Sequence, residues 1–468
     1  MKYSRLSIFL LLCIVCWVIL TIVLFSDSPL KPQSQNNKSA LLQYIEKLES
    51  KIKEQLETYK VLSKKLETLK QQSKITKQEL FEIQEIFSEI GLRTPFVLEK
   101  ETETNVKQNS KISIVNPAQE PPKKDTITQL PVLVFSCNRA SVSKCLKGLI
   151  KYRPNPDKFP IIVSQDCAHR PTAEVIKSFP EVTHIQQPDQ SEPDVPAGEQ
   201  KFKGYFKISR HYKWALKQVF GTFNYSAVII VEDDLDISPD FYEYFSSTYP
   251  LLVKEPSLWC VSAWNDNGKL NLVDVEHSEI LYRTDFFPGL GWMMTKDVWD
   301  ELEPKWPKSY WDDWMRLPEQ RKDRACIRPE VSRTRTFGKI GVSNGMFFDK
   351  HLKFIKLNEV FIDFSHRNLS YLLQSNYDKE FLQKVYSVPI ASAMDVKANN
   401  LNFDGPARIP YHTKDAFKNS AKLLGLMDDF KSGVPRTGYR GIVTFFYNGR
   451  RIYLAPNLNW KGYDPSWS

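Results

Sequence analysis

The chain has 468 residues, of which 42% are hydrophobic, 25% charged and 13% aromatic, so its length predicts roughly three folded units. This composition is typical of a globular protein and excludes a wholly disordered chain, a collagen and a polytopic membrane protein. Lysine and arginine number 64 against 55 aspartates and glutamates, a net charge of +9 without a basic run that would indicate a nucleic-acid partner. An anionic small substrate or an anionic membrane surface would each account for this excess.

The first predicted element is a membrane anchor at residues 6–25. This segment carries no charge, and at about 1.5 Å per residue it spans about 30 Å, the thickness of a bilayer core. Lys2 and Arg5 precede it and Asp27 follows it, so the positive-inside rule makes residues 1–5 a cytoplasmic tail and sends the rest of the chain across the membrane. The alternative is a cleaved signal peptide, but the apolar run is long for one and no A-x-A cleavage site follows.

Residues 26–129 are predicted to form a stem. Apolar residues recur at alternating steps of three and four over about 41–69, a heptad pattern that favours a coiled-coil stalk and a homo-oligomer. The alternative is a single solvated amphipathic helix without a partner. Residues 100–129 are polar and contain prolines, which indicates a linker. Glycosylation sequons begin at Asn37, Asn224 and Asn368 and matter only if this side of the membrane is lumenal.

From Pro131 onward, short apolar runs alternate with helical stretches. Strands are predicted at 131–136, 159–164, 182–186 and 227–231, with a helix over about 141–152. This alternation is typical of an α/β fold whose mostly parallel sheet is covered by helices on both faces.

Polar residues follow three of these predicted strands. They are Arg139, Asp166 and the run Glu232-Asp233-Asp234. Because ligands bind outside the carboxyl ends of the strands in such sheets, we expect these side chains to converge on one edge.

The acidic run suits a metal site. Three adjacent carboxylates repel one another, and a divalent cation such as Mn²⁺ or Mg²⁺, which prefers oxygen ligands, relieves that repulsion. Such an ion uses one or two carboxylates together with substrate phosphates. The alternative is an acidic loop that caps the following helix, in which Asp236 and Ser238 do similar work.

A second acidic pair stands between tryptophans in the run Trp311-Asp312-Asp313-Trp314. A partly desolvated setting would raise a carboxylate pKa and make it a better general base. The alternative is that one of the two aspartates caps a helix beginning near Trp314.

Two further candidates are ambiguous from the sequence. His211 lies in a helical stretch, and the residues alone favour a packed helix residue over a ligand contact. Ser343 lies in the glycine-containing loop 338–345, and loops of this kind can close over a nucleotide and exclude water.

Near the carboxyl end, Asn448-Gly449 between apolar runs predicts a β-hairpin in a smaller domain that begins near Ile355.

Seven cysteines are present, and two of them, Cys13 and Cys16, lie in the apolar anchor. The other five contain no C-x-x-C pair, so a zinc site is not expected. In an oxidising compartment at most two disulfides form among the five, and spacing does not choose among the pairings.

Several long strings resemble one enzyme family. They are CNRA (137–140), VIIVEDDLDISPDF (228–241), FFPGLGWMM (286–294), EPKWPKSYWDDWMR (303–316), KSGVPRTGYRGIVTF (431–445) and GYDPSW (462–467). Together they resemble the Golgi N-acetylglucosaminyltransferase I family over about residues 131–468. The anchor and stem are similar to that family in layout only.

The resemblance implies an architecture and an activity. It implies a GT-A-type nucleotide-sugar-binding domain at 130–354 and a smaller α/β domain at 355–468. It implies transfer of GlcNAc from UDP-GlcNAc, with inversion, in β-1,2 linkage to the α-1,3-linked mannose of the Man5GlcNAc2 N-glycan, the step that initiates hybrid and complex N-glycans. It also implies a single-pass type II protein of the Golgi membrane with a lumenal catalytic domain.

The resemblance also implies roles for individual residues. Asp234 would hold Mn²⁺, and Asp312 would be the general base. Glu232 would orient the sugar or its neighbours. The residues expected to contact the donor are Arg139, Asp166, His211, Asp233 and Ser343. The implied disulfides are Cys137–Cys167 and Cys260–Cys326, with Cys145 left as the free thiol. We further expect the loop containing Ser343 to become ordered when UDP-GlcNAc binds and to form part of the acceptor site.

Two rival functions remain from the sequence. One is a related transferase that adds GlcNAc to O-linked mannose, but the stem leaves no room for the extra carbohydrate-binding module that such relatives carry. The other is a non-catalytic coiled-coil membrane tether, which the intact acidic run and Asp312 argue against.

Overall fold

The computed structural model describes residues 128–339, 341–342, 345 and 348–467, together with Ser50 and Lys53. The chain divides into two compact units, 1–119 and 120–468, and the elements below belong to the second. The predicted anchor, the linker up to residue 127, and Ser343 lie outside the described residues. The same holds for the heptad segment except Ser50 and Lys53, which are helical. Within the described part, no helix has the length and hydropathy that crossing a membrane requires.

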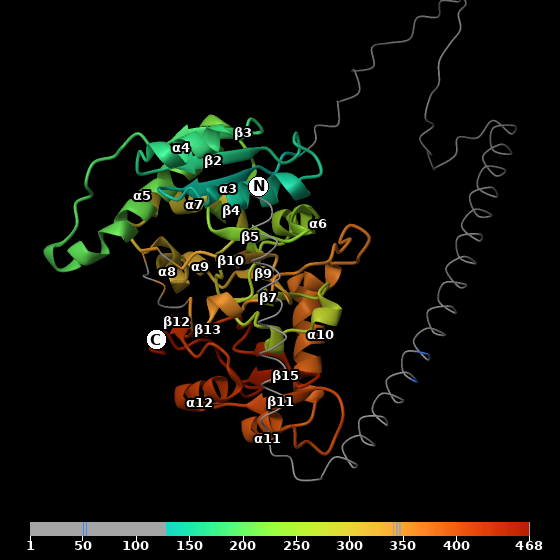
Figure 1. Ribbon diagram of the computed structural model, residues 1–468. Coiled ribbons are helices and arrows are strands. Elements are labelled where there is room, and N and C mark those ends of the chain that lie inside the picture. Colours follow the sequence, from blue (N-terminus) through green and yellow to red (C-terminus); the bar gives the residue numbers. More distant parts are fainter. Residues whose placement is uncertain are drawn as a thin grey trace, which may run out of the picture. The chain divides into compact units, whose positions relative to one another are not determined.

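The centre of the second unit is an eight-stranded mixed sheet with the strand order β3-β2-β1-β4-β8-β6-β9-β7 (Figure 1). In chain order the strands are β1 (Val132–Ser136), β2 (Ile161–Gln165), β3 (Val182–Gln186), β4 (Ala227–Glu232), β6 (Leu258–Ser262), β7 (Leu281–Thr284), β8 (Trp292–Thr295) and β9 (Ala325–Pro329). The four predicted strands are confirmed as β1 to β4, which pair in parallel. The mostly parallel sheet has antiparallel exceptions, because β8 enters between β4 and β6 and β7 pairs antiparallel with β9.

The two faces of the sheet carry two separate hydrophobic cores. Along β1, Val132 and Val134 pack into one core, whereas Leu133 and Phe135 pack into the other. This alternation follows from the two-residue period of a strand, and a strand that is buried on both faces reads as a continuous apolar run. The sheet is therefore sandwiched between layers, as the sequence predicts.

Helices cover both faces. On the first face lie α3 (Val142–Tyr152), α4 (Arg170–Lys177) and α6 (Phe241–Lys254), and on the second lie α5 (Lys203–Lys217) and α7 (Lys296–Leu302). In α3 the buried residues are Val142, Cys145, Leu146 and Leu149, the spacing of one helical face.

Short elements connect these layers. They are η1 (Ala197–Phe202), η2 (Gln218–Thr222), β5 (Leu235–Ile237), η3 (Leu270–Leu272), η4 (Val275–His277), η5 (Glu303–Lys305), α8 (Trp311–Met315), α9 (Pro318–Arg321), β10 (Thr334–Thr336), η6 (Leu352–Phe354) and η7 (Ser370–Leu372). Strands β5 and β10 pair antiparallel directly after the acidic run.

The carboxyl-terminal part forms a smaller α/β layer with its own core. A three-stranded sheet of β11 (Ala407–Pro410), β15 (Arg450–Ala455) and β14 (Val443–Tyr447) packs with α11 (Ala393–Ala398) and α12 (Lys414–Leu424). The predicted hairpin is confirmed, because Tyr447 pairs with Arg450 around Asn448 and Gly449. Both turn residues have positive φ angles, 48° and 77°, as the tight turn requires. The remaining elements are α10 (Gln374–Ser387), β12 (Phe430–Lys431) and β13 (Val434–Pro435).

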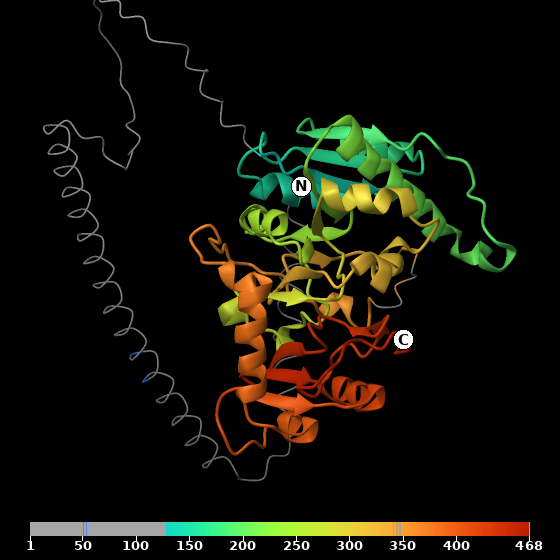
Figure 2. The ribbon, with the colours of Figure 1, turned by 180° about the vertical axis from the view of Figure 1, so that it is seen from behind.

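This smaller layer is joined to the main sheet through α10, which Figure 2 shows in orange from behind. Tyr377, Phe381 and Val385 of α10 belong to the same core as Val132 of β1. The predicted domain boundary near Ile355 stays a prediction, and one hydrophobic core extends across it.

Two disulfides connect neighbouring strands. Cys137–Cys167 joins the turn after β1 to the turn after β2, and Cys260–Cys326 joins register partners on β6 and β9. Among the described cysteines, Cys145 is free and buried. This is the pairing that the family resemblance implies.

Candidate active site

A pocket of about 910 Å³ opens at the carboxyl ends of β1 and β4. Its walls are the turn after β1, one side of α5, the acidic run and the segment around 337–342 that follows β10. Five of the predicted site residues line it, namely Arg139, His211, Glu232, Asp233 and Asp234. The rule that ligands bind at the carboxyl edge of a parallel sheet therefore located the pocket correctly.

The acidic run is held by a few specific contacts. Arg139 Nη1 lies 2.7 Å from Asp234 Oδ2 and 3.2 Å from Asp233 Oδ1, and Ser136 Oγ donates to Asp233 Oδ2 at 2.9 Å. Tyr212 donates its hydroxyl proton to Glu232 Oε1 at 3.1 Å. Two of the three carboxylates, Asp233 and Asp234, thus share the Arg139 guanidinium, whereas Glu232 is bound by a neutral hydroxyl.

Burial raises the pKa of all three carboxyls, to about 6 for Asp233. The cause is desolvation, which disfavours the charged form, and the repulsion between neighbouring carboxylates adds to it for Glu232 and Asp233. The capping alternative is not supported, because α6 has Asp240 at its N-cap without a side-chain capping bond.

Asp234 has the geometry expected of a cation ligand. Its Oδ1 is buried and has no hydrogen-bond partner among the described residues. A buried acceptor without a partner is costly, and a bound cation would satisfy it. In the described part of the chain, no group of three or more acidic, histidine or cysteine side chains suited to a metal occurs. A hard divalent ion can bind through one or two carboxylates and keep water and phosphate ligands.

Gly338 makes room for this carboxylate. A Cβ atom on Gly338 would lie 2.0 Å from Asp234 Oδ2, and one on Gly341 would lie 3.2 Å from an Arg139 nitrogen. The segment after β10 therefore packs directly over the ion pair, and any larger residue at 338 would displace Asp234. Ser343, in the same segment, lies outside the described residues.

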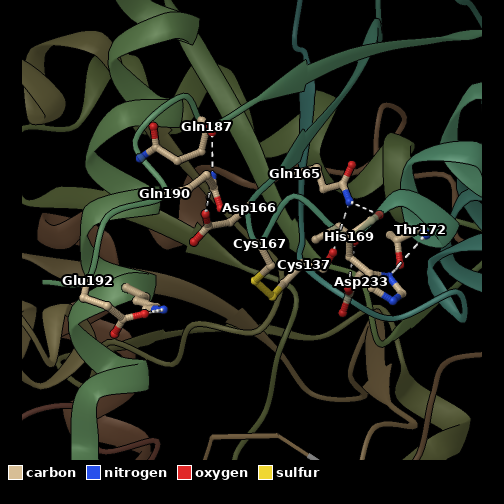
Figure 3. The surroundings of a disulfide bond; sticks show 12 residues. Cys137, Gln165, Asp166, Cys167, His169, Thr172, Gln187, Gln190, Glu192 and Asp233 are labelled. Atoms are coloured by element: carbon tan, nitrogen blue, oxygen red, sulfur yellow. Dashed lines mark hydrogen bonds and ion pairs between the residues drawn. A yellow bond between two sulfur atoms is a disulfide. The ribbon is translucent and has the colours of Figure 1, made fainter. Parts of the chain in front are cut away.

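Asp166 and His211 lie at the neighbouring strand end. His211 shares a hydrogen bond of 2.7 Å with Ser164 Oγ, and burial lowers its pKa to about 4, partly opposed by the charge of Asp166. Asp166 accepts a hydrogen bond of 3.1 Å from Gln190 Nε2, and the Cys137–Cys167 disulfide lies beside it (Figure 3). His211 is thus both a packed helix residue and a wall of the pocket, whereas Asp166 is not among the residues that line it.

Asp312 lies beyond the aromatic wall of the pocket. Trp311 stacks on Tyr212, with ring centroids 4.3 Å apart, and Tyr212 lines the pocket. Burial, the contact with Glu232 and the more distant charges of Asp312 and Asp234 all raise the pKa of Tyr212. Asp234, the expected cation ligand, and Asp312, the expected base, therefore both act electrostatically on the same tyrosine from different segments.

The structure corrects two expectations for the aspartate pair. Helix α8 begins at Trp311, so Asp312 and Asp313 lie in its first turn and cap nothing. The Asp312 side chain is 43% exposed and paired with Arg316 Nη1 at 2.7 Å, so it is only partly shielded from water. The expected rise in a carboxylate pKa is wrong for Asp313. Burial alone would raise the pKa of Asp313, but Arg316 and Lys431 outweigh it and hold this pKa below its usual value.

Sequence reasoning missed several residues of this site. Ser136 ends β1 and would have been found by the same strand-end rule that singled out Arg139. Arg316 stands four residues after Asp312, the spacing of an ion pair on one helical face. No local signal identifies Tyr212, Trp311 or Gly338, because their importance arises from contacts between distant segments.

Comparisons with known proteins agree with this picture. The model of the GNT-I family matches residues 41–467, a range that begins well before the recognisable motifs. An Arabidopsis thaliana protein named alpha-1,3-mannosyl-glycoprotein 2-beta-N-acetylglucosaminyltransferase is 42% identical over 335 residues, which are 70% of this chain and 74% of that protein.

Solved structures are similar only in part. A Pyrobaculum calidifontis mannosyltransferase, PcManGT, in complex with GDP-Man and Mn²⁺ is 14% identical with a TM-score of 0.26, over 38% of this chain and 47% of that one. TarS 1–349 of S. aureus in complex with UDP is 11% identical with a TM-score of 0.30, over 43% and 58% of the two chains. The chain thus spans about half the length of each of these two structures.

Proposed function

We infer that this chain, which belongs to the GNT-I family, is a glycosyltransferase that adds N-acetylglucosamine in β-1,2 linkage to the α-1,3-linked mannose of N-glycans. The observation that best supports a particular site for this reaction is the buried Oδ1 of Asp234, just after β4. This oxygen has no hydrogen-bond partner among the described residues. This carboxylate, which we propose as the cation ligand, lies in the same pocket as Arg139 and His211.

The donor proposed for this pocket is UDP-GlcNAc. Arg139 supplies the positive charge that a diphosphate needs, and its present partners are the carboxylates that a cation would neutralise. Asp233 and His211 contact the donor from the same walls, and Asp166 acts from the adjacent strand end. Glu232, held by Tyr212, orients the sugar. Ser343 completes this set by resemblance to the family.

Asp234 is the proposed ligand of a divalent cation, and the family resemblance favours Mn²⁺. When bound, such an ion neutralises the charge of the departing diphosphate. The orphaned Oδ1 supports this assignment, and the single-carboxylate arrangement fits an ion that keeps water and phosphate ligands.

Asp312 is the proposed general base, which accepts the proton of the acceptor 2-hydroxyl during a single inverting displacement. Arg316 fixes the carboxylate through Oδ2. The exposure of the side chain leaves it accessible to an acceptor. Inversion requires one such base, and the opposite stereochemistry would instead use a carboxylate nucleophile.

The deciding experiment is a transfer assay with the full chain, UDP-GlcNAc, Mn²⁺ and the Man5GlcNAc2 glycan. Asp312→Asn should lower kcat by about a hundredfold or more while donor binding persists, since a general base contributes on the order of 10²–10⁴ in rate. Asp313→Asn is the matched control, because its side chain is similarly exposed and also pairs with Arg316, but its second oxygen binds Lys431, and the variant should remain active. Full activity of Asp312→Asn would remove the assignment.

The same assay separates the rival transferase. An O-mannosyl peptide replaces the glycan, and preferential transfer to it would favour the alternative function. A chain that binds the donor without transferring to either acceptor would favour the non-catalytic tether.

The proposal includes a single-pass type II placement in the Golgi membrane, with residues 6–25 as the anchor and 120–468 in the lumen. Its support is the sequence pattern alone. Glycosylation of Asn224 or Asn368 in cells, together with protection from added protease in intact vesicles, checks this orientation. Cleavage of the catalytic part in intact vesicles would contradict it.

A further inference from the structure

Three aromatic side chains form a partly exposed cluster beside the proposed base. Phe202 ends η1, Tyr205 lies in the first turn of α5, and Tyr310 immediately precedes α8. The Tyr205 and Tyr310 rings stack with centroids 4.7 Å apart, and Phe202 lies 6.4 Å and 6.3 Å from them. Phe202 is 37% exposed, and contiguous exposed aromatic surface of this kind marks binding sites more often than isolated apolar residues do.

The backbone of Tyr310 is unfavourable and thereby points to function. Its φ of 49° and ψ of 45° place it in the left-handed region, which residues with a bulky side chain rarely adopt. Such conformations persist where surrounding contacts impose them, and they gather at binding and catalytic sites. Here the conformation accompanies the stacking of the Tyr310 ring on Tyr205, while its carbonyl accepts the Trp314 amide at 2.9 Å and starts α8.

The cluster adjoins Asp312. Tyr310 is two residues before Asp312, and the pKa of Tyr205 is raised by burial and then by the charges of Asp312 and Asp313. Neither Tyr205 nor Tyr310 has a hydrogen-bond partner for its hydroxyl among the described residues, so both hydroxyls are open to a ligand. A neutral ligand that has both apolar faces and hydroxyl groups would match these aromatic rings and tyrosine hydroxyls.

We propose that Phe202, Tyr205 and Tyr310 form the acceptor subsite, on which a mannose ring of the N-glycan stacks. A pyranose presents a face of C–H groups, and the electron-rich face of an aromatic ring attracts that slightly positive surface. The two free hydroxyls then bind sugar hydroxyls at the edge of the stack. This inference rests on the proposed function, because the base must meet the acceptor and the cluster lies beside the proposed base.

The test is a kinetic comparison that varies donor and acceptor separately. Tyr310→Gly should raise the KM for the Man5GlcNAc2 glycan about tenfold, the scale of one lost aromatic stacking contact, and leave the KM for UDP-GlcNAc unchanged. Glycine adopts the left-handed backbone without penalty, so this variant keeps the native loop and its Tm should not fall. Tyr310→Phe retains the ring and should keep most of the acceptor affinity.

Tyr205→Ala provides a second variant outside the strained position and should show the same selective loss. Phe223→Ala is the matched control, because Phe223 is a similarly exposed aromatic near Tyr225 at the other end of the helical segment. It should leave both KM values unchanged. Saturation-transfer NMR with the free glycan gives a readout independent of turnover, and the mannose signals should weaken in Tyr310→Gly.

The outcomes separate this inference from the proposed function. Wild-type protein that fails to transfer GlcNAc to the glycan refutes the proposed function. Active wild-type protein together with an unchanged acceptor KM in Tyr310→Gly and Tyr205→Ala refutes the acceptor subsite alone. A change confined to the donor KM also refutes it, because it would assign the cluster to UDP-GlcNAc.

Discussion

At the residue scale, the site is organised around one ion pair. Arg139 and Asp234 come from the ends of two neighbouring parallel strands and meet at 2.7 Å beneath Gly338. One carboxylate oxygen is bound by the guanidinium and the other is orphaned. The second oxygen is therefore the one left for a cation, while the first keeps Asp234 in place against Arg139.

Gly338→Ala should cut kcat/KM for UDP-GlcNAc by at least about tenfold. A Cβ would lie 2.0 Å from Asp234 Oδ2, so the carboxylate must turn away from Arg139. Gly338 does not have a positive φ, so the substitution brings a contact effect without backbone strain. Gly221→Ala is the control, since nothing lies within 4 Å of its Cβ. Equal activity of the two variants would contradict the role of Gly338.

The imidazole of His211 should make stability depend on pH. Burial lowers its pKa from 6.5 to about 4. At a pH between these two values, the imidazole is protonated in the unfolded chain but neutral in the folded chain. The contribution of His211 to the free energy of unfolding is fully present above the unfolded pKa. It is lost as the pH falls, by about 2 kcal/mol between about pH 7 and pH 5.

Denaturant unfolding of wild type and His211→Gln at the two pH values measures this term. The glutamine amide can still bond Ser164, so the variant should lose less stability on acidification than wild type. The raised pKa values of Glu232 and Asp233 have the opposite effect on stability, and they have it in both proteins. The difference between wild type and His211→Gln in the stability lost on acidification therefore measures the effect of the imidazole alone. Equal slopes would show that His211 is not buried as described.

At the element scale, the two disulfides have different positions relative to the pocket. Cys137 lines the pocket and is tied to the turn after β2, whereas Cys260–Cys326 lies between two strands in the interior of the sheet. The first therefore fixes the turns that present Arg139 and Asp166, and the second fixes only the packing of strands.

Replacing each disulfide by two alanines should separate these effects. Both double variants should lose about 4 kcal/mol of unfolding free energy, because the closed loops have separations of 30 and 66 residues. Only Cys137→Ala/Cys167→Ala should also raise the KM for UDP-GlcNAc. Chemical unfolding and donor-dependent initial rates check both statements, and equal KM values in the two variants would contradict the distinction.

At the scale of the second unit, the main sheet and the carboxyl-terminal layer depend on each other. Arg283 Nη1 of β7 donates to the Leu372 carbonyl at 2.9 Å, and the Asp285 amide donates to Gly438 O at 2.7 Å. Glu330 is 1% exposed and pairs with Arg451 at 2.8 Å. Removing either the main sheet or the carboxyl-terminal layer would leave buried charges and apolar surface of the other without partners.

A fragment that ends at residue 354 should therefore fail to fold, although the expected nucleotide-binding domain ends there. The 120–468 unit should unfold in one calorimetric transition, because α10 and the main sheet share a core. Two separate transitions, or a cooperatively folded 120–354 fragment, would show that the predicted boundary divides independent domains.

The sequence determined the parts of this protein whose signals are local. Continuous apolar runs located β1 to β4, the strand-end rule located Arg139 and the acidic run, and Asn448-Gly449 located the hairpin. The long motifs identified the family, which the family model and the Arabidopsis relative confirm. Periodicity and turn chemistry depend on neighbouring residues, so one sequence is enough to read them.

Only the tertiary structure decided which distant groups meet. It inserted β8 between β4 and β6 and placed Gly338 against Asp234. It also held Tyr310 in a left-handed conformation against Tyr205. These features depend on strand order and on side-chain contacts between segments far apart in the chain, and no local pattern encodes either of them.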